Sequence, residues 1–104
     1  MDQSALDCCQ KAVGYTFKDL SLLELALTHS SVANTRVESN ERLEFLGDAV
    51  LGLVVCQELY ERFTDLLEGQ MTKIKSTVVS RKTCSEIAEK TGIAESLVLG
   101  KGMP

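Results

Sequence analysis

Apolar and polar positions along this chain are spaced as they are in amphipathic helices. Apolar residues recur three or four positions apart, in segments that end at glycines or at short polar stretches. No segment alternates with a period of two between hairpin turns, so the pattern predicts no β-strand. We expect an all-α domain, a bundle of about five to six helices at residues 2–13, 22–29, 40–63, 68–80, 81–91 and 95–99.

Several residues mark where these helices begin and end. Gly14 and Gly92 follow the last apolar position of their segments, where glycine commonly stops a helix. Short polar side chains accept hydrogen bonds from the free backbone N–H groups at helix starts. The candidate N-cap residues are Asp19 or Ser21 for the second helix and Ser39 or Asn40 for the third. Residues 30–39 are polar and aperiodic, which predicts a loop with one helical turn near 31–34.

The segment NERLEFLGDAVL, residues 40–51, places three carboxylates on one face of the third helix. Glu41, Glu44 and Asp48 are three, four and seven positions apart, so they form one stripe. The positions around them are residue types expected in a core: Leu43, Phe45, Leu46, Ala49, Val50 and Leu51. Ionised carboxylates in apolar surroundings are costly unless a cation or hydrogen-bond donors compensate them. The stripe therefore indicates half of a metal site.

Each acid of the stripe also has a purely structural explanation. Glu41 in the first turn suits the positive end of the helix dipole and needs no ligand, and Glu44 is ambiguous. Asp48 is more informative, because aspartate is a poor interior helix residue and its neighbours are apolar. Arg42 lies on a different side of the helix, so a cation from another helix would have to pair with Asp48. Spacing alone leaves the ion pair and the metal site both open.

A metal held by these residues would have oxygen ligands only. Oxygen ligation suits Mg²⁺ or Mn²⁺ rather than zinc or copper, and such sites are typical of phosphodiester hydrolysis. Two carboxylates of one helix do not complete such a site, and Glu68 is the best remaining acid. Its structural alternative is a helix cap or a first-turn acid.

Two glycines interrupt the third helix. Gly47 and Gly52 each cost about 1 kcal/mol relative to alanine inside a helix. That cost predicts the close approach of another backbone or a ligand, with plain helix–helix packing as the alternative. On the other helices we expect the following positions to face inward: Ala5, Cys8, Cys9, Ala12, Val13, Met71, Ile74, Val78, Val79, Cys84, Ile87 and Ala88.

Basic residues gather loosely on and after the fourth helix. Lys73, Lys75, Arg81 and Lys82 form either a solvated face, with Lys73 and Lys75 pointing outward, or an edge that contacts phosphate. The one histidine, His29, has no serine or cysteine beside it in a triad-like arrangement, so we interpret it as a satisfied helix-end residue.

Length, charge and cysteine content narrow the class of protein. A chain of 104 residues forms one domain at most, and its net charge of −4 argues against binding nucleic acid by electrostatics alone. The four cysteines follow no zinc spacing and His29 cannot complete a tetrahedral set with them, so reduced thiols are expected. No signal peptide is visible, and the longest apolar run, 49–56, is too short to span a bilayer. We expect a soluble, cytoplasmic protein.

Several motifs resemble those of the ribonuclease III family, in order and spacing. NERLEFLGDAVL resembles the signature motif of its endonuclease domain. LALTHSS at 25–31, the stretch from EGQMTK to AEKTG at 68–92 and LVLGKG at 97–102 agree with it in register. The resemblance covers nearly the whole chain. It implies that residues 1–104 form the N-terminal portion of one endonuclease domain.

The resemblance implies a helical domain that forms a homodimer and cleaves double-stranded RNA by Mg²⁺-dependent hydrolysis. This hydrolysis would leave 5′-phosphate and 3′-hydroxyl ends. The usual function of the family is the processing of ribosomal and other RNA precursors, including messenger RNA. By motif position Glu44 and Asp48 would be metal ligands, and Glu41 and Glu68 additional catalytic acids. Phe45 would insert into a pocket on the partner subunit.

The chain also departs from the family pattern. An aspartate and a glutamate one turn apart normally follow the GKG segment, and a basic double-stranded-RNA-binding domain follows them; neither is present here. We therefore expect this chain alone to bind Mg²⁺ weakly, to cleave RNA poorly or not at all, and to self-associate. The competing hypotheses are a non-catalytic relative that serves dimerisation or RNA docking, and a metal-independent helical interaction module.

Overall fold

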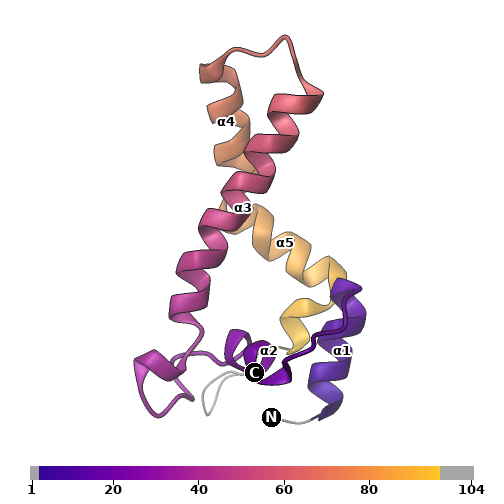
Figure 1. Ribbon diagram of the computed structural model, residues 1–104, viewed down its shortest axis with the longest axis vertical. Coiled ribbons are helices and arrows are strands. Elements are labelled where there is room, and N and C mark those ends of the chain that lie inside the picture. The colour runs from indigo at the N-terminus through magenta and orange to yellow at the C-terminus, as the bar shows by residue number, and fades with distance from the viewer. Residues whose placement is uncertain (1–2, 97–104) are drawn as a thin grey trace.

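The structure is a computed structural model that describes residues 3–96, and Figure 1 shows its helical architecture. The described residues form five α-helices and two 3₁₀ turns with no strand among them, as the sequence pattern predicts. In chain order the elements are α1 (Gln3–Val13), α2 (Leu20–Ala26), η1 (Arg36–Glu38), α3 (Glu41–Arg62), α4 (Glu68–Val78), α5 (Arg81–Thr91) and η2 (Ile93–Ser96).

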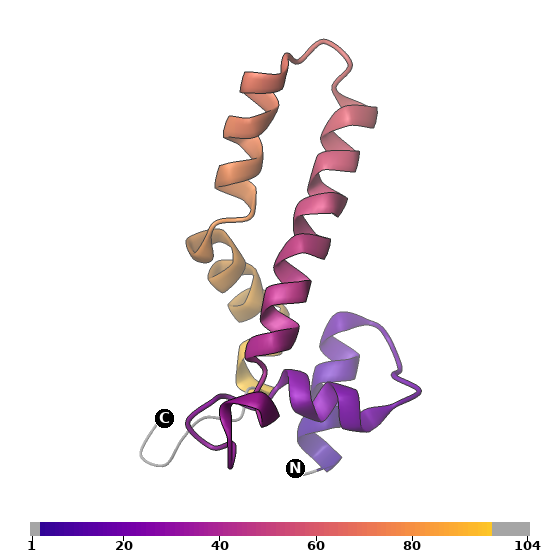
Figure 2. The same ribbon diagram turned by 60° about the vertical axis from the view of Figure 1, so that its left-hand side comes forward.

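Helix α3 is the spine of an elongated molecule. Its 22 residues span about 33 Å, and the whole chain measures 47 × 26 × 24 Å. Helix α4 runs back beside the C-terminal half of α3, and α5 then returns toward the opposite end (Figures 1 and 2). There η2 packs against both α1 and α5, while α2 packs against α1. The molecule therefore has a helical hairpin at one end and a small base at the other.

Local capping chemistry fixes most helix ends where the sequence predicts them. The Asp19 carboxylate caps α2 by accepting the Ser21 N–H at 3.0 Å. The Ser21 hydroxyl and this N–H both donate to the carboxylate and lower its pKa from 3.8. Gly14 and Gly92 take positive φ angles of 72° and 84°, which stop α1 and α5.

The start of α3 is held by two adjacent polar residues. Asn40 is the N-cap residue by position, but its side chain donates to the Ala26 carbonyl at 3.2 Å instead. The capping bond comes from Ser39, whose hydroxyl accepts the Glu41 N–H at 3.3 Å and donates to the Arg36 carbonyl at 2.6 Å. Ser39 is 1% exposed. Both predicted residues therefore fasten α3, each to a different neighbour.

The clustered part of the hydrophobic core is small and lies in the base, while one further buried residue, Leu59, lies in α3 at the hairpin end. Leu6 and Cys9 of α1 pack with Leu23 and Leu27 at α2, and Phe17 and Leu20 lie against this cluster. The predicted apolar side of α1 is only partly right. Leu6 is buried although it was not expected to be, while Cys8 and Val13 are exposed. The buried face is centred on Leu6 and Cys9, three positions apart, because these two residues face α2.

Helix α3 corrects a second expectation, since most of its apolar side chains are exposed. Leu43 is half-buried, but the other positions expected in a core are exposed: Phe45, Leu46, Ala49, Val50 and Leu51. Apolar residues occur all around this helix, whereas its substantial neighbours are only α4 and η1. The chain exposes 8084 Å², against about 5,800 Å² for a compact monomer of this mass. Much of α3 thus has the character of an uncovered core helix.

Smaller corrections concern the loop and the later helices. The helical turn expected near 31–34 occurs at η1, Arg36–Glu38. Met71, Val79, Cys84 and Ala88 are half-buried as expected for inward positions, whereas Ile74, Val78 and Ile87 are exposed. A helix expected at 95–99 lies mostly outside the described residues; the described part ends in the turn η2.

The two glycines of α3 differ in their surroundings. A Cβ on Gly52 would lie 3.5 Å from Cε and 3.6 Å from Nζ of Lys75, so the lysine side chain crosses α3 at this notch. Lys75 was expected to point outward, but the missing side chain of Gly52 lets it lie half-buried between the helices. No atom of the described neighbours lies within 4 Å of a Cβ on Gly47. The predicted close approach therefore occurs at Gly52, through a side chain rather than a backbone.

Two further properties bear on the class of protein. None of the four cysteines forms a disulfide, in agreement with the expected reduced thiols, and among the described residues no group of three His, Cys, Asp or Glu side chains could hold a metal. No described helix is long and apolar enough to cross a membrane.

Candidate functional site

The acidic stripe of α3 faces the joint between α4 and α5 across an open hollow of about 640 Å³. Helix α3 lines one wall with its three acids, Phe45 and two small or aliphatic residues. The joint supplies the other wall. The complete lining is Glu41, Glu44, Phe45, Asp48, Ala49, Leu51, Val79, Arg81 and Cys84. The stripe predicted from residue spacing therefore lies in one place and opens onto a second element.

Glu44 and Asp48 are the two unpaired acids of this hollow. They lie one helical turn apart on the same face of α3, and both side chains are exposed. Neither carboxylate has a hydrogen-bond or ion-pair partner in the part of the chain that the structure describes. The apolar burial expected around Asp48 is absent, so desolvation gives no reason for a counter-ion here. The ion-pair alternative for Asp48 also finds no partner among these residues.

Glu41 is engaged by a cation outside the helix. Arg36 of η1 donates from Nη2 to one carboxylate oxygen at 2.6 Å and from Nε to the other at 3.1 Å. These hydrogen bonds lower the pKa of Glu41 from 4.5, and the charges of Arg36 and His29 add to the effect. The pKa of Arg36 is raised by the same bond. Glu41 is thus already compensated, unlike the other two acids of the stripe.

His29 behaves as the satisfied helix-end residue that the sequence predicts. Its Nδ1 lies 2.8 Å from the Ser31 hydroxyl and accepts the Ser31 N–H at 3.1 Å. These bonds fold the chain just after α2. His29 therefore acts as a local loop anchor.

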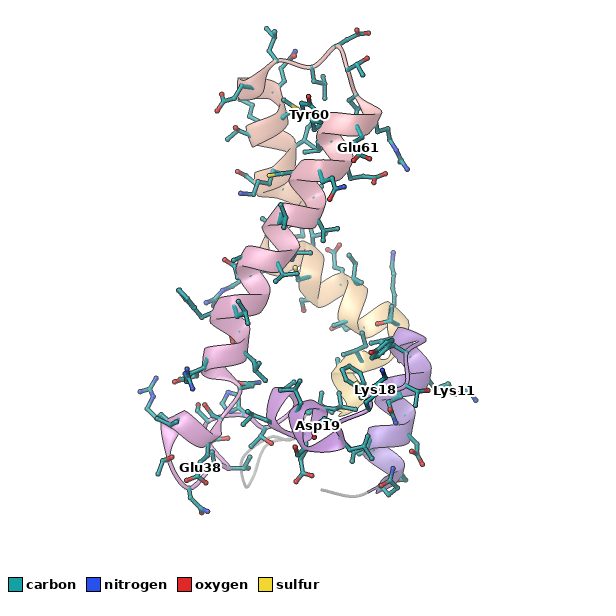
Figure 3. All side chains as sticks on the ribbon, viewed as in Figure 1. Lys11, Lys18, Asp19, Glu38, Tyr60 and Glu61 are labelled. Atoms are coloured by element: carbon teal, nitrogen blue, oxygen red, sulfur yellow. The ribbon has the colours of Figure 1, made fainter. Side chains whose placement is uncertain are left out.

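Glu68 lies at the other end of the molecule from the stripe. It begins α4 and lines a separate hollow of about 570 Å³ with Tyr60, Lys75 and mostly apolar residues of α3 and α4. Tyr60 lies about 18 Å along the helix from Asp48, and Figure 3 shows it where α3 and α4 run side by side, far from Glu38 at the base. Within one copy of the chain, Glu68 is not brought together with Glu44 and Asp48.

The donor set suits a hard cation but is incomplete. Glu44 and Asp48 offer free carboxylate oxygens on adjacent turns, which is the ligand chemistry of Mg²⁺ or Mn²⁺. Glu41 is bound to Arg36, and no third acid joins these two within the described residues. An ion held here would need further oxygen ligands from water, from substrate or from other protein groups.

One feature of the site was missed at the level of sequence, and a second was only partly predicted. Arg36 lies in an aperiodic loop, and its pairing with Glu41 depends on how that loop folds back over the start of α3. Arg81 was expected in a loose group of four cations that form either a solvated face or a phosphate-contacting edge, and its place in the hollow with the acids was not predicted. The sequence contained a partial signal for this position, because Arg81 directly follows the joint between the predicted fourth and fifth helices.

Comparison with known proteins decides the family. The model of the family described as ribonuclease-III-like matches residues 19–104. The chain belongs to the ribonuclease III-like family. This confirms the resemblance drawn from NERLEFLGDAVL and its companion motifs.

Individual relatives agree with the family match. The chain is 52% identical over 98 residues to ribonuclease 3 of Rhodopirellula baltica, covering 94% of this chain and 37% of that protein. It is 50% identical over 96 residues to ribonuclease 3 of Symbiobacterium thermophilum, covering 90% and 41%. The chain therefore spans about two fifths of the length of these ribonuclease III relatives.

A solved structure shows the same fold. The nuclease domain of ribonuclease III from Campylobacter jejuni superposes with a TM-score of 0.86 at 36% identity, over 92% of this chain and 66% of that one. That structure is described as showing flexibility in a region involved in dimer formation. The all-helical arrangement is thus that of a ribonuclease III nuclease domain.

Proposed function

We propose that this chain forms part of the nuclease domain of an endoribonuclease that cleaves double-stranded RNA by Mg²⁺-dependent phosphodiester hydrolysis. The products would carry 5′-phosphate and 3′-hydroxyl ends, and the substrates would be ribosomal and other RNA precursors, including messenger RNA, in the cytoplasm. One observation carries the proposal: Glu44 and Asp48 stand unpaired on one face of α3, inside the family-matched region.

Glu44 and Asp48 would hold the Mg²⁺, or Mn²⁺ in its place. The ion, when bound, supplies a water activated for attack and positive charge against the phosphate oxygens. The chain's own part is to hold two carboxylates at a fixed separation, which a straight helix does with little flexibility. Glu41 and Glu68 are proposed as additional acids. Glu41 is oriented by Arg36, and Glu68 would reach a cleavage site only from a second subunit.

We propose a homodimer formed through α3. Six residues share one face of this helix, and four of them are exposed apolar or aromatic residues: Phe45, Ala49, Leu53 and Tyr60. The other two, Gly52 and Cys56, are small. If two α3 helices pack antiparallel about a two-fold axis between Gly52 and Leu53, Phe45 meets Tyr60 at each end and Gly52 leaves room for Leu53 at the centre.

Phe45 supports this arrangement most strongly. Its side chain is 83% exposed, and the antiparallel register places it opposite Tyr60 of the partner subunit. Beside Tyr60 lies the apolar hollow between α3 and α4, lined also by Leu53 and Met71. An exposed aromatic side chain and an apolar hollow are complementary, and the symmetry of the pair uses both twice.

The dimer is tested by sedimentation of wild type, Phe45→Ala and a matched control. Phe45→Ala should weaken self-association by about 10-fold or more, because it removes an aromatic contact that the two-fold symmetry uses twice. Tyr15→Ala removes an exposed aromatic side chain in the loop after α1 and should leave self-association unchanged. Equal association of all three proteins would refute the interface on α3.

The catalytic proposal is tested in two steps. In this chain, Mn²⁺ titration followed by NMR should show weak binding that Asp48→Asn abolishes, while Asp65→Asn in the α3–α4 loop leaves it intact. In the product of the whole reading frame, Asp48→Asn should reduce cleavage of a long RNA duplex by at least about 100-fold, since even an outer-shell change costs up to that much. Robust cleavage by the Asp48→Asn protein would overturn the assignment.

The same experiment separates the main alternative, a non-catalytic relative that only dimerises or docks on RNA. Such a protein would bind duplex RNA without Mg²⁺-dependent cleavage, and Asp48→Asn would change neither property. The pairing of Glu41 with Arg36 and the distance of Glu68 from the stripe are compatible with this alternative, so cleavage by wild type is the deciding measurement.

A further inference from the structure

Arg81 faces the same hollow as the unpaired carboxylates of α3. The hollow is bounded by Glu44 and Asp48 on one side and by Arg81 and Cys84 of α5 on the other. Arg81 is exposed and forms no ion pair in the described part of the chain, so it lies near the acids without being bound to them. The guanidinium and the two carboxylates line the same hollow but do not pair with one another. All three groups can therefore bind a ligand.

The joint between α4 and α5 fixes the position of Arg81. The Ser80 hydroxyl caps α5 by accepting the Thr83 N–H at 3.2 Å. The Thr83 hydroxyl in turn donates to the Thr77 carbonyl of α4 at 2.9 Å. These bonds tie the first turn of α5 to the last turn of α4, so the backbone of Arg81 is held by both helices.

Arg81 does not serve the stability of its own helix. It is the first residue of α5, Lys82 follows it, and the first turn contains no acid. Cations are unfavourable at the positive end of a helix dipole. Natural proteins tend to break such local rules at functional sites.

We infer that Arg81 is a positioning residue, which binds a backbone phosphate of the RNA strand as that strand enters the hollow beside Glu44 and Asp48. The inference rests on the proposed function. A phosphodiester approaching two carboxylates is repelled by them, and a guanidinium on the facing wall offsets this repulsion and offers a planar pair of donors that matches phosphate oxygens. The bound phosphate is then held across the hollow from the acids.

The experiment compares Arg81→Gln, Arg81→Lys and Lys82→Gln in the whole reading-frame product. Lys82 is the matched control, because it is an exposed cation one position along the chain and does not line the hollow. Binding of a 20-base-pair RNA duplex is measured in Ca²⁺ at several KCl concentrations. Cleavage of the same duplex is measured in Mg²⁺.

Arg81→Gln should reduce the slope of log K against log salt by about 1, because one phosphate contact is lost. It should raise KM about 10-fold with a smaller change in kcat, and Arg81→Lys should recover part of the loss. Lys82→Gln should lie closer to wild type in both measurements. Thermal stability should not fall in any variant, which excludes a merely structural role.

Two results would overturn the inference. Identical salt slopes and KM values for Arg81→Gln and Lys82→Gln would show that Arg81 adds only general charge. A wild-type protein that binds no duplex would refute both this inference and the proposed function. Duplex binding with an Arg81-dependent slope but no cleavage would refute the catalytic proposal alone and support the role of Arg81.

Discussion

The Arg36 guanidinium holds both carboxylate oxygens of Glu41, at 2.6 and 3.1 Å, and thereby ties η1 to the first turn of α3. Of the three acids in the stripe, only this one has a bound cation among the described residues. The pair divides the stripe into a compensated acid and two free ones.

This pair predicts a shift in the titration of Glu41. The hydrogen bonds to Arg36 lower the pKa of Glu41 from 4.5, so the folded state holds its proton less tightly than the unfolded state does. The pair therefore contributes to stability above about pH 4.5, and that contribution is lost as pH falls through the lowered pKa. Arg36→Gln should raise the Glu41 pKa toward 4.5 in carboxyl NMR titrations. Arg42→Gln is the control, and a Glu41 pKa unchanged by Arg36→Gln would contradict the pairing.

Ser39 predicts a larger effect than its size suggests. Its hydroxyl caps the Glu41 N–H and donates to the Arg36 carbonyl, and its side chain is buried. Ser39→Ala should lower the free energy of unfolding by about 1 to 2 kcal/mol, because the Glu41 N–H loses its cap and the Arg36 carbonyl keeps only the Ser39 N–H as a donor. Urea unfolding measures this change in the free energy of unfolding. Ser31→Ala, at an exposed position, should stay within about 0.5 kcal/mol of wild type; equal losses in the two variants would refute the capping role.

The small core predicts that the base controls the stability of a single copy. Leu27→Ala should cost about 3 kcal/mol, because Leu27 is only 6% exposed and packs with Leu6, Cys9 and Leu23. Leu53→Ala should cost little in dilute solution, since that side chain is 66% exposed. Denaturant unfolding at low protein concentration distinguishes the two. A loss at Leu53 as large as that at Leu27 would mean that α3 is covered even in dilute solution.

Gly47 offers a test of what surrounds the first half of α3. None of residues 3–96 meets a Cβ at that position, so Gly47→Ala should stabilise a single copy by up to about 1 kcal/mol through helix propensity. The melting temperature of a dilute sample reports this gain. If instead the variant melts lower, another backbone packs on Gly47, and the glycine serves a contact outside this chain.

Helix positions were predictable from the sequence because their causes are local. Gly14, Gly92 and Asp19 act within four residues of themselves, and the structure shows each in its expected role. The helix at Arg81–Thr91 has the predicted bounds. The grouping of Glu41, Glu44 and Asp48 is equally local, since helical spacing alone places them on one face.

Burial was less predictable, because it depends on which other elements are present. An apolar position such as Phe45 was expected in a core, yet the neighbours available in this chain do not cover it. Lys75 was expected to point outward because charge normally does, but the notch at Gly52 accepts its stem. Arg36 could not be assigned to Glu41, since the path of an aperiodic loop follows from tertiary contacts rather than periodicity.

The distance of Glu68 from the stripe could have been predicted. Glu68 begins the helix that follows a 22-residue one, so chain connectivity alone puts it beside the far end of α3. Its separation from Asp48 in one copy follows from the rise per residue. A role at the same cleavage site therefore requires a second copy, which links the catalytic and dimer proposals.

The uncovered surface of α3 has a consequence for mass action. Folding leaves many apolar side chains of α3 exposed to water, so any species that covers them binds the folded form and not the unfolded one. The apparent melting temperature should then rise with protein concentration, and it should rise further when a covering segment is added. For this chain, folding and association would be one coupled equilibrium, and the midpoint of unfolding would depend on the protein concentration.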